Sequence, residues 1–308
     1  MLFPIDHGNS AMKTVNFVFP SGLIDNPIRP PVDTEMLEYD GKFWTLSGQR
    51  ISYMRDKTKD ERYWILTLFA IAKELEHRGA EHTASVHLAA GLPLTSFGRD
   101  KKSFRSYLYR DGSAIPFRYE GQDYTVTIQE VSLFPQGYAA VLTQTELLDE
   151  PSVIVADIGG WTVDLMRLDN RIPNAASCRS LELGMIRCID EISEQVRRLF
   201  GLSLTTAQIE SALRGSSGGM DERIRAVIHT QAGQYVQDLL SAIMESGLDV
   251  RAMPTVFLGG GAALMKRHGG AVEGLFRPFI LDDVCLNARG YERLAAQMSQ
   301  RERSGQDG

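Results

Sequence analysis

The feature that most constrains this chain is a pattern that occurs twice: an apolar run ends in an aspartate, and glycine follows two residues later. The first copy is "PIDHGNSAMK", from Pro4 to Lys13, and the second is "VADIGGWTVDL", from Val155 to Leu165. Glycine at such a turn permits positive φ and lets backbone N–H groups approach an anion with no Cβ in the way. One copy at the head of each half of the chain predicts a structural unit that is built twice.

The size and composition of the chain set its class. With 308 residues it is long enough for two domains, because single cores rarely grow far past roughly 250 residues. It is 43% hydrophobic and 23% charged, as ordinary globular proteins are. No stretch approaches the roughly 20 apolar residues of a membrane span, and the N-terminus lacks a secretory signal pattern. We therefore expect a cytoplasmic protein that does not contact a membrane.

The cysteines argue against a zinc site and a disulfide framework, and the net charge argues against direct binding to nucleic acid. Cys178, Cys188 and Cys285 have no C-x-x-C spacing, which disfavours a zinc site and a disulfide framework. A formal net charge of −6 opposes non-specific attraction to nucleic acid, because that attraction depends on Lys and Arg neutralising phosphates. We expect reduced thiols and no direct contact with nucleic acid.

In the first half, the pattern predicts a strand-rich start and one long helix. Asp40-Gly41 suits a hairpin turn, because both central residues of such a turn need positive φ. Thr58 and Glu61 have the spacing of a capping box, and apolar residues follow at helical spacing up to Gly79. Strands are expected at "SVHLAAGLPL" and "DYTVTIQEVSLF". A basic cluster between them, from Arg99 to Arg110, is either a solvated face or a partner contact.

The second half is expected to form a strand, a turn, a strand and then helices. Apolar residues from Ile186 to Phe200 mark one helix, and a longer helix begins near Asp221. The stretch "TVFLGGGAALMKR" predicts a strand, a glycine turn and a helix. Asn287 can cap a last helix that runs through Leu294, and the polar tail after Gln300 is expected to fray.

The two aspartates constrain the ligand. Asp6 and Asp157 each end a strand beside a cradle for an anion, and a carboxylate repels an anion unless a hard divalent cation lies between them. The arrangement therefore predicts magnesium and a polyphosphate. Lys13 can add a positive charge at the first turn, and Thr162 can add a hydroxyl at the second.

A third glycine turn supplies a further binding element. Gly259, Gly260 and Gly261 follow a strand and precede a helix, so N–H groups at the helix start can face a ligand, and bare backbone lets a flat base lie close. A dinucleotide-binding G-x-G-x-x-G would need a small residue where Leu264 stands, and this turn lies late in the chain. The chain also has no G-x-x-x-x-G-K-[ST]. Both of those phosphate-binding motifs are therefore set aside.

Two phosphate turns in separate halves and a late glycine turn resemble the pattern of the actin-like ATPase superfamily. Within it, the chain is most similar to the ParM-type bacterial actins of plasmid segregation. The resemblance is carried by "IDHGNSAMK", "VADIGGWTVDL" and "VFLGGGAALM", and it continues in "GLPLTSFG", "LELGMIRCIDEI" and "NARGYERL". These six stretches occur in the family's order and extend over essentially the whole chain.

The resemblance implies an α/β, actin-like fold of two ribonuclease-H-like domains around a nucleotide cleft. Domain I would span residues 1–150, with the first phosphate hairpin and a short outer subdomain. Domain II would span residues 151–308, with a last helix near 287–299 that returns to domain I. Proteins of this kind bind ATP or GTP with Mg²⁺ and polymerise head to tail; the sequence leaves the choice of base open.

The resemblance also gives roles to residues by position. Asp6 and Asp157 would hold the metal through waters. The nucleotide-binding set would be Gly8, Asn9, Ser10 and Lys13 in the first turn, Gly159, Gly160, Trp161 and Thr162 in the second, and Gly259, Gly260 and Gly261 at the adenosine. Asp190 or Glu191 would reach the ribose, with solvation of a helix face as the alternative.

An ATPase of this type needs a polar residue that orients the attacking water. Gln136 in "LFPQGY" occupies the matching place and would complete the catalytic set with Asp6 and Asp157. A glutamine can position water without acting as a strong base, which suits slow hydrolysis coupled to assembly. A glutamate is common at this place among bacterial relatives, so Glu130 is one alternative; Gln136 as a plain linker residue is another.

Two residues depart from the family pattern. Pro4 lies inside the expected first strand, although proline suits an edge or first position better than a central one. Trp161 is bulkier than expected in the second phosphate turn, and we expect its ring to pack outward.

The leading hypothesis is a polymerising ATPase that forms dynamic filaments for plasmid DNA segregation, with a centromere-binding adaptor as its partner. The first alternative is a small-molecule, sugar-type kinase of the same superfamily. It is disfavoured because "AAGLPLTSFG" has no acid before Asp100 and the cysteines are scattered. The second is a scaffold with the actin fold that does not polymerise. The assignments to plasmid segregation and to the adaptor rest on family analogy alone.

Overall fold

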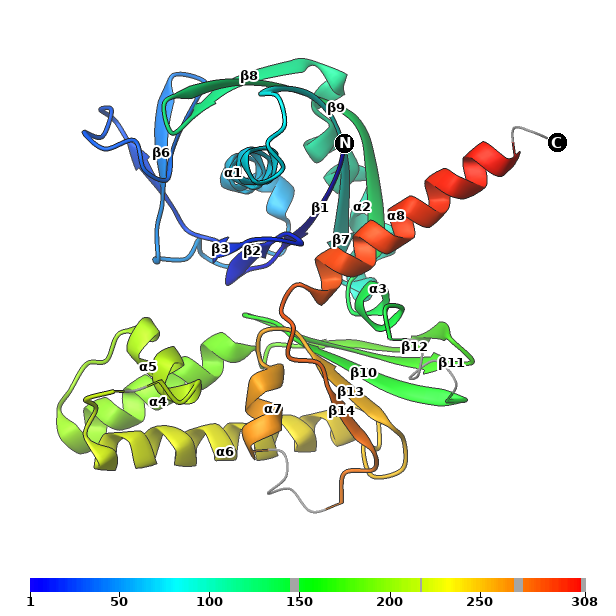
Figure 1. Cartoon of the computed structure of the whole chain (residues 1–308). Coiled ribbons are helices and arrows are strands. Elements are labelled where there is room, and N and C mark those ends of the chain that lie inside the picture. Colours follow the sequence, from blue (N-terminus) through cyan, green and yellow to red (C-terminus); the bar gives the residue numbers. More distant parts are fainter. Residues whose placement is uncertain (145–149, 217, 269–273, 306–308) are drawn as a thin grey trace. The chain divides into compact units, whose positions relative to one another are not determined.

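The computed structural model contains two compact units and describes residues 1–144, 150–216, 218–268 and 274–305 (Figure 1). Unit 1 comprises Met1–Gln144 and Cys285–Gly308, and unit 2 comprises Thr145–Val284. The chain therefore leaves unit 1 after Gln144 and returns to it at Cys285. Each unit has its own sheet and its own apolar core.

Unit 1 holds a nine-stranded sheet and the helices that pack on it. Its strands are β1 (Leu2–His7), β2 (Ala11–Lys13), β3 (Val18–Pro20), β4 (Leu23–Asn26), β5 (Met36–Tyr39), β6 (Lys42–Leu46), β7 (Thr83–Leu92), β8 (Ala114–Tyr119) and β9 (Gln122–Pro135). Its helical segments are η1 (Lys57–Lys59), α1 (Arg62–His77), α2 (Leu94–Tyr109), η2 (Arg110–Gly112), α3 (Tyr138–Val141) and α8 (Leu286–Gly305). The strand order is β3-β2-β1-β7-β9-β8-β5-β6-β4. Figure 1 shows α1 inside the curve of this sheet and α8 running along β1, β7 and β9.

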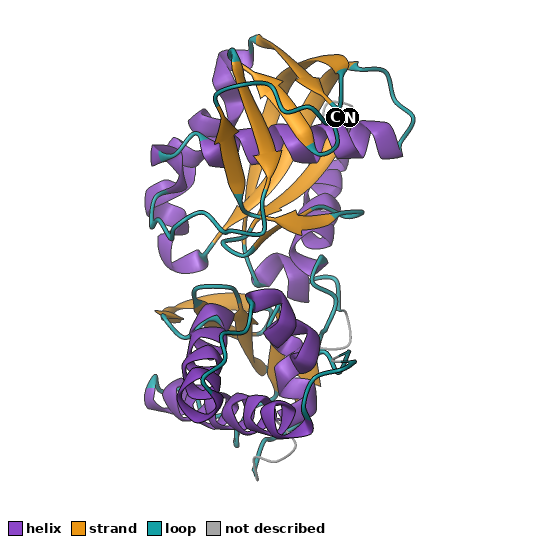
Figure 2. Cartoon of the chain, turned by 90° about the vertical axis from the view of Figure 1, so that its left-hand side faces the viewer, coloured by secondary structure: helices purple, strands orange, loops and turns teal. Residues whose placement is uncertain are grey.

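Unit 2 holds a five-stranded sheet and four helices in its described part. Its strands are β10 (Ser152–Ile158), β11 (Val163–Asp169), β12 (Ile172–Leu181), β13 (Thr255–Leu258) and β14 (Pro278–Ile280). Its helices are α4 (Met185–Phe200), α5 (Thr206–Leu213), α6 (Glu222–Glu245) and α7 (Ala262–His268). The strand order is β12-β11-β10-β13-β14. In Figure 2 the helices of this unit lie in front of its strands.

The two sheets share one five-strand plan. In unit 1, β1, β2 and β3 form an antiparallel meander, and β7 and β9 extend the sheet in parallel from β1. In unit 2, β10, β11 and β12 form the same meander, and β13 and β14 extend it in parallel from β10. Helices connect the parallel strands in both units, as parallel pairing requires. The prediction of a structural unit that is built twice is confirmed.

Helix α1 is buried on all sides over most of its length. Every residue from Tyr63 to Ala72 is buried, because the sheet curves around the helix. This explains why α1 is apolar all round, whereas α4 buries only one face through residues such as Ile189, Ile192 and Val196. Over the described ranges, none of the helices combines the length and the apolar character that a membrane span requires.

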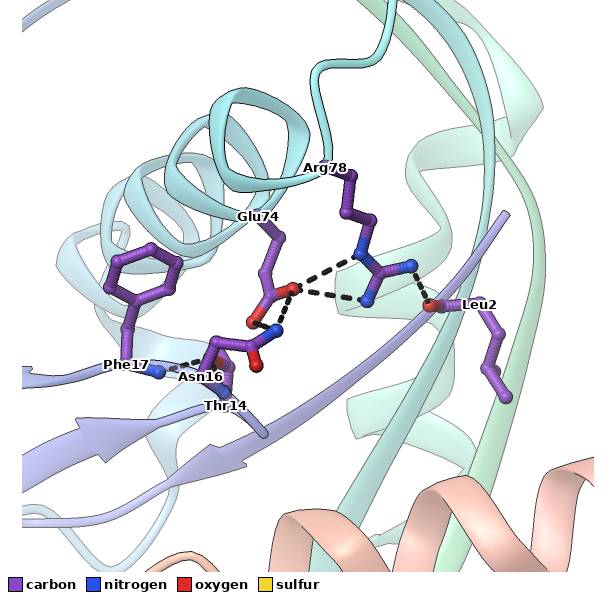
Figure 3. Close-up of polar contacts among 6 residues, drawn as sticks. All are labelled: Leu2, Thr14, Asn16, Phe17, Glu74 and Arg78. Atoms are coloured by element: carbon purple, nitrogen blue, oxygen red, sulfur yellow. Dashed lines mark hydrogen bonds and ion pairs between the residues drawn. The ribbon is translucent and has the colours of Figure 1, made fainter.

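A buried polar network fastens α1 to the strands around it (Figure 3). Glu74 of α1 is fully buried, and its Oε2 accepts hydrogen bonds from Arg78 Nη2 and from Asn16 Nδ2, each at 3.0 Å. Arg78 Nη1 also donates to the carbonyl of Leu2 at 3.0 Å. A buried carboxylate needs such partners, because an uncompensated buried charge costs several kcal/mol, roughly 3–5 when one partner of a pair is removed. The network thereby fixes the start of β1 and the β2–β3 connection against α1.

Several elements predicted from the sequence are confirmed. The hairpin joins β5 to β6, and its turn residues Asp40 and Gly41 have φ of 51° and 72°. The two predicted strands of the first half are β7 and β9, and α4 ends at Phe200, followed by Gly201, which has φ of 68°. The long helix α6 is capped by Asp221, and β13, the glycine turn and α7 follow in the predicted order.

Pro4 lies at a local edge of β1, as its missing N–H predicts. On one side of β1, Pro4 is in register with Ala89 of β7. On the other side, β2 pairs with Asp6 and His7, and no strand in the described part of the chain faces Pro4 there. The proline is therefore compatible with a strand that is third in the sheet order.

The predicted start of α1 is wrong. Thr58 and Glu61 do not form a capping box, because Thr58 lies in η1 and its amide donates to Asp56 Oδ1 at 3.0 Å. The helix begins at Arg62, whose amide donates to Asp60 Oδ1 at 2.8 Å. Asp56 thus takes the Thr58 amide that the capping box would have used, and Asp60 accepts from the first residue of the helix instead.

The prediction for the last helix also needs correction. Asn287 does not cap α8, because it lies inside the helix and its Oδ1 accepts a hydrogen bond from the amide of Gly137 at 2.9 Å. The helix also continues past Gln300 to Gly305, where fraying was expected. The final residues of that tail, 306–308, lie outside the described part of the chain.

Candidate functional site

The first acid-led turn joins β1 to β2. Asp6 and Lys13 face each other across the hairpin. A Cβ at position 8 would lie 2.4 Å from the carbonyl oxygen of Ala11, so only glycine fits there. Gly8 does not have positive φ, and the prediction that a left-handed backbone explains this glycine is therefore wrong. Crowding by the carbonyl group of Ala11 is the reason that position 8 requires glycine.

The carboxylate of Asp6 is the centre of this turn. Its side chain is 3% exposed, Oδ2 accepts a hydrogen bond from Lys13 Nζ at 3.1 Å, and Oδ1 accepts one from Gln136 Nε2 at 2.9 Å. Burial acts to raise the pKa of Asp6, but the nearby charges of Lys13 and Lys57 outweigh it, so the pKa lies below its ordinary value of 3.8. Asp6 is therefore an ionised carboxylate at neutral pH. The structure brings three predicted site residues, Asp6, Lys13 and Gln136, into direct contact.

Three side chains from outside the hairpin hold its backbone and its tip. They come from η1, from α1 and from the connection between β3 and β4. The contacts are Lys57 Nζ to the carbonyl of His7, Tyr63 Oη to Asn9 Oδ1 at 3.2 Å, and Ser21 Oγ to the carbonyl of Gly8 at 2.6 Å. The amide of Ser21 also donates to the carbonyl of Ser10 at 3.1 Å. The sequence gives no sign of these contacts, because residues 57 and 63 lie far from the motif and belong to no recognisable pattern.

The second acid-led turn repeats the first. It joins β10 to β11, with Asp157 opposite Asp164, so both turns enclose the same number of residues. A Cβ at Gly159 would lie 3.0 Å from the carbonyl oxygen of Thr162, which is the contact that Gly8 makes in the first turn. Neither Gly159 nor Gly160 has positive φ, so the left-handed prediction is wrong here as well. Asp157 is 8% exposed, and Thr162 Oγ1 donates to Asp164 Oδ2 at 3.1 Å.

Helix α4 holds the second turn through backbone hydrogen bonds. The amides at its start donate to carbonyl groups of the turn: Gly184 to Trp161 at 2.9 Å, Met185 to Gly159 at 3.0 Å, and Ile186 to Gly160 at 2.9 Å. Amides at a helix start have no partner within the helix, so these bonds satisfy both segments at once. A Cβ at Gly184 would lie 2.4 Å from the backbone of Trp161, so this approach requires glycine. Gly184 was part of a quoted motif but was not predicted as a site residue.

The third glycine turn packs directly on the second acid-led turn. Gly259 has φ of 86°, and a Cβ there would lie 2.4 Å from Asp157 Oδ1. A Cβ at Gly261 would lie 2.2 Å from Ile158 Cγ2, and the Gly261 amide donates to the carbonyl of Ile158 at 3.0 Å. Gly260 differs, because a Cβ there would meet no described atom within 4 Å. The fold thus requires two of these glycines, and the middle one leaves open space beside the backbone.

The two turns differ in the charge opposite their aspartates. Lys13 faces Asp6 in the first hairpin, whereas Asp164 faces Asp157 in the second. The shared backbone plan therefore carries an acid–base pair in one unit and two acids in the other.

The remaining candidates lie apart from these turns or at their margins. Asp190 is exposed on α4, and Glu191 pairs with Arg187 at 2.8 Å. Trp161, expected to pack outward, is half-buried, and its Nε1 is buried. Glu130, the alternative to Gln136, lies 3.5 Å from His87, a residue in register with Leu2 at the other end of β1 from Asp6. Of the two, only Gln136 contacts the first turn.

The acidic residues suit a cation that keeps most of its water. Asp6 and Asp157 offer hard carboxylate oxygens, which Mg²⁺ prefers. Within the described ranges, no group of three or more His, Cys, Asp and Glu side chains gathers to bind a metal directly. Mg²⁺ typically retains several waters and uses one or two carboxylates together with substrate phosphates, and the single aspartate that ends β1 or β10 at each turn fits that mode of binding.

Comparison with known proteins now identifies the fold. Residues 5–138 match the family described as actin like proteins N terminal domain. The chain has the actin-like fold, and residues 5–138 are similar to the N-terminal domain of actin-like proteins. No curated protein sequence matches the chain.

Solved structures of actin-like proteins match almost the whole chain. Ta0583, an archaeal actin homolog, has a TM-score of 0.78 at 20% identity, over 96% of this chain and 99% of its own; its complex with ADP has also been determined. ParM of Bacillus thuringiensis with ATP has a TM-score of 0.71 at 17% identity, over 96% and 99%. The Alp12 filament structure has a TM-score of 0.67 at 16% identity, over 96% and 98%. At these identities the similarity establishes the fold of this chain.

His7, next to Asp6, predicts a pH dependence of stability. Its ring is fully buried, Nε2 lies 2.9 Å from Thr67 Oγ1, and burial together with the charge of Lys57 lowers the pKa of His7 to about 3. As the pH falls below 6.5, the unfolded chain takes up a proton at this position that the folded chain does not. Stability should therefore fall between pH 6.5 and about 3, by up to roughly 1.4 kcal/mol per pH unit.

The variant His7→Gln should show a shallower fall in the free energy of unfolding, because it has no imidazole to protonate. Urea denaturation at pH 7, 6 and 5 measures the slope. His82→Gln, which removes a partly exposed histidine of the same unit, is the matched control. A slope that is identical in His7→Gln and in the parent would contradict the assignment.

Proposed function

We propose that this protein is a cytoplasmic, polymerising ATPase that binds ATP or GTP with Mg²⁺ and forms dynamic filaments. The observation that carries the proposal is the repeated turn: each unit presents a buried aspartate at a strand end, followed by a glycine at which a Cβ would crowd the carbonyl oxygen three residues later. A further glycine turn packs on the second copy. Such turns suit phosphate groups, because backbone N–H groups can approach them without an intervening side chain.

In this proposal, the turn at Gly8, Asn9 and Ser10 and the turn from Gly159 to Thr162 bind the β- and γ-phosphates. The carbonyl groups of the second turn already accept hydrogen bonds from α4, which fixes the orientation of its peptide planes. Lys13 adds a positive charge at the first turn. Asp6 and Asp157 hold Mg²⁺ through its waters, and the bound ion neutralises charge that develops on the phosphates.

Gln136 is the residue that we assign to orientation of the attacking water. Gln136 is the residue after the end of β9, and its side-chain amide donates to Asp6 Oδ1. The side chain is therefore held beside the first phosphate turn. A carboxamide both donates and accepts hydrogen bonds, so it can position a water molecule. Positioning of the water raises the rate of hydrolysis without a strong base. We assign Gly260 to contact with the nucleobase of the nucleotide, because the open space beside Gly260 leaves room for a flat ring against the backbone.

The relatives support the proposal as analogies. Ta0583 has been determined with ADP, ParM of Bacillus thuringiensis with ATP, and Alp12 as a filament. The most specific part of the proposal is a role in plasmid DNA segregation, with a centromere-binding adaptor as the partner. This part rests on the similarity to ParM.

Polymerisation is the first test. ATP with Mg²⁺ should give light scattering, a sedimentable fraction and filaments in negative stain, because assembly requires the bound triphosphate. ADP and the nucleotide-free protein should give much less polymer, and EDTA should abolish it. Absence of polymer at every concentration would contradict the proposal and favour a scaffold, and sugar-dependent release of ADP would favour a kinase.

Two site variants should separate metal binding from water orientation. Asp157→Ala should abolish metal-dependent hydrolysis, whereas Gln136→Ala should keep nucleotide binding, lower turnover by about 10²-fold and give long-lived filaments. Single-turnover hydrolysis and nucleotide titration measure the two effects. Gln129→Ala, at an exposed glutamine of the same strand, is the control. Equal turnover in Gln136→Ala and the parent would remove the assignment of Gln136.

Gly260→Ala should weaken nucleotide binding with little change in stability. The added methyl group meets no described protein atom, and Gly260 does not have positive φ, so the fold tolerates it. A base that lies against this backbone would be displaced, and we expect an affinity loss of about tenfold, or roughly 1.4 kcal/mol. Calorimetric titration with a non-hydrolysable ATP analogue and Mg²⁺ measures it. Gly48→Ala, also in open space, is the control, and an unchanged affinity in Gly260→Ala would place the base elsewhere.

A further inference from the structure

We infer that Asn287 is a positioning residue for Gln136. The buried amide group of Asn287 holds the turn at Gly137, and this turn sets the orientation of the neighbouring Gln136. The inference rests on the proposed function, in which Gln136 orients the attacking water. It adds a residue from α8 that sequence reasoning assigned to a helix cap.

The turn at Gly137 is unusual and needs support. The amide of Tyr138 donates to the carbonyl of Gln136 at 2.8 Å, which closes a three-residue turn around Gly137. Gly137 has φ of 72° and ψ of −52°, close to the γ-turn with positive φ, which is rare and strained. Glycine relieves the clash with a side chain but leaves the turn in an unfavourable conformation. A strained turn persists only when its surroundings fix it.

Asn287 supplies the fixed partner. Its Oδ1 accepts a hydrogen bond from the amide of Gly137 at 2.9 Å in a buried setting. Without that acceptor, the turn would bury an unsatisfied N–H group, at a cost of about 1–3 kcal/mol. The second backbone contact of this segment, from the amide of Gln136 to the carbonyl of Leu92 at 2.9 Å, joins it to β7. The backbone on both sides of the Gln136 side chain is therefore held.

Helix α8 cannot shift to adjust this contact. A Cβ at Gly290 would lie 2.2 Å from the carbonyl oxygen of Ala139, so α8 and α3 meet backbone to backbone. On the next residue, the hydroxyl of Tyr291 would lie 2.0 Å from a Cβ at Gly91 of β7. These two close approaches set the depth and the rotation of α8, and they place Asn287 where its acceptor reaches Gly137.

A short chain of hydrogen bonds thus leads from α8 to the first phosphate turn. Asn287 binds Gly137, Gln136 is the adjacent residue, and its side chain binds Asp6 at 2.9 Å. Displacement of a catalytic group by about 1 Å can cost roughly 10² in rate, so a relaxed turn should lower turnover while leaving most contacts to the nucleotide intact.

The test compares variants that differ in the acceptor. Asn287→Ala and Asn287→Leu both remove it, one leaving space and the other filling it, whereas Asn287→Asp keeps an oxygen in the same place. We expect the first two to lower single-turnover hydrolysis about tenfold with less than a twofold change in nucleotide affinity, and Asn287→Asp to retain most of the activity. Amide exchange of the Gly137 segment, followed by mass spectrometry, should accelerate in the first two variants only.

A double variant decides whether Asn287 acts through Gln136. If it does, Asn287→Ala combined with Gln136→Ala should lose no more activity than Gln136→Ala alone, because coupled residues are not additive. Additive losses, or normal turnover in both Asn287→Ala and Asn287→Leu, would overturn the inference and leave the proposed function standing. If Gln136→Ala hydrolyses nucleotide as fast as the parent, the proposed role of Gln136 is wrong, and the inference about Asn287 fails with it.

Discussion

A buried carboxylate must be compensated, and much of unit 1 is arranged around the compensation of Asp6. The side chain ends a strand in the middle of a sheet, where an unpaired charge would oppose folding. Lys13 reaches it from the adjacent strand, Gln136 from the end of β9, and Lys57 adds charge from η1. Three segments that are distant in sequence, the first hairpin, η1 and the residue after β9, are thereby brought to one point.

Unit 2 secures its own turn by other means. There the backbone provides most of the support: three amides at the start of α4 and one from the third glycine turn donate to carbonyl groups of residues 158–161. Glycines at 184, 259 and 261 are required because these segments approach one another too closely for a Cβ. A site made of main-chain groups has few side chains to rearrange, so its shape is set when the unit folds.

The plan of the fold and the members of each turn could be predicted from the sequence, because local patterns encode them. Aspartate and glycine at a fixed spacing marked both hairpins, and apolar periodicity marked α1, α4 and α6. The physical reason for the hairpin glycines could not be predicted, since a left-handed backbone and a crowded Cβ select the same residue. Helix α5 was missed although Thr205 and Gln208 form a capping box, because the helix is short and its apolar face is small.

Tertiary contacts explain the other failures. Lys57 contacts the first turn from a segment with no motif, and only the folded chain places it there. Asn287 stands where asparagine commonly caps a helix, but its side chain instead accepts a hydrogen bond from the amide of Gly137, which is distant in sequence. Thr58 is a local exception: it has suitable spacing for a capping box, yet Asp56, two residues before it, accepts its amide. In each case the sequence pattern permits two outcomes, and it does not show which partner the folded chain supplies.

The reversal of charge between the two hairpins gives two copies of one backbone plan different electrostatics. Two hairpins of equal geometry and equal charge would favour the same kind of ligand. A lysine faces the aspartate of the first hairpin and compensates that carboxylate, whereas an aspartate faces the aspartate of the second and adds another carboxyl group. A single residue difference at matching positions therefore separates the two copies in the charge that each can accommodate, although their backbones agree.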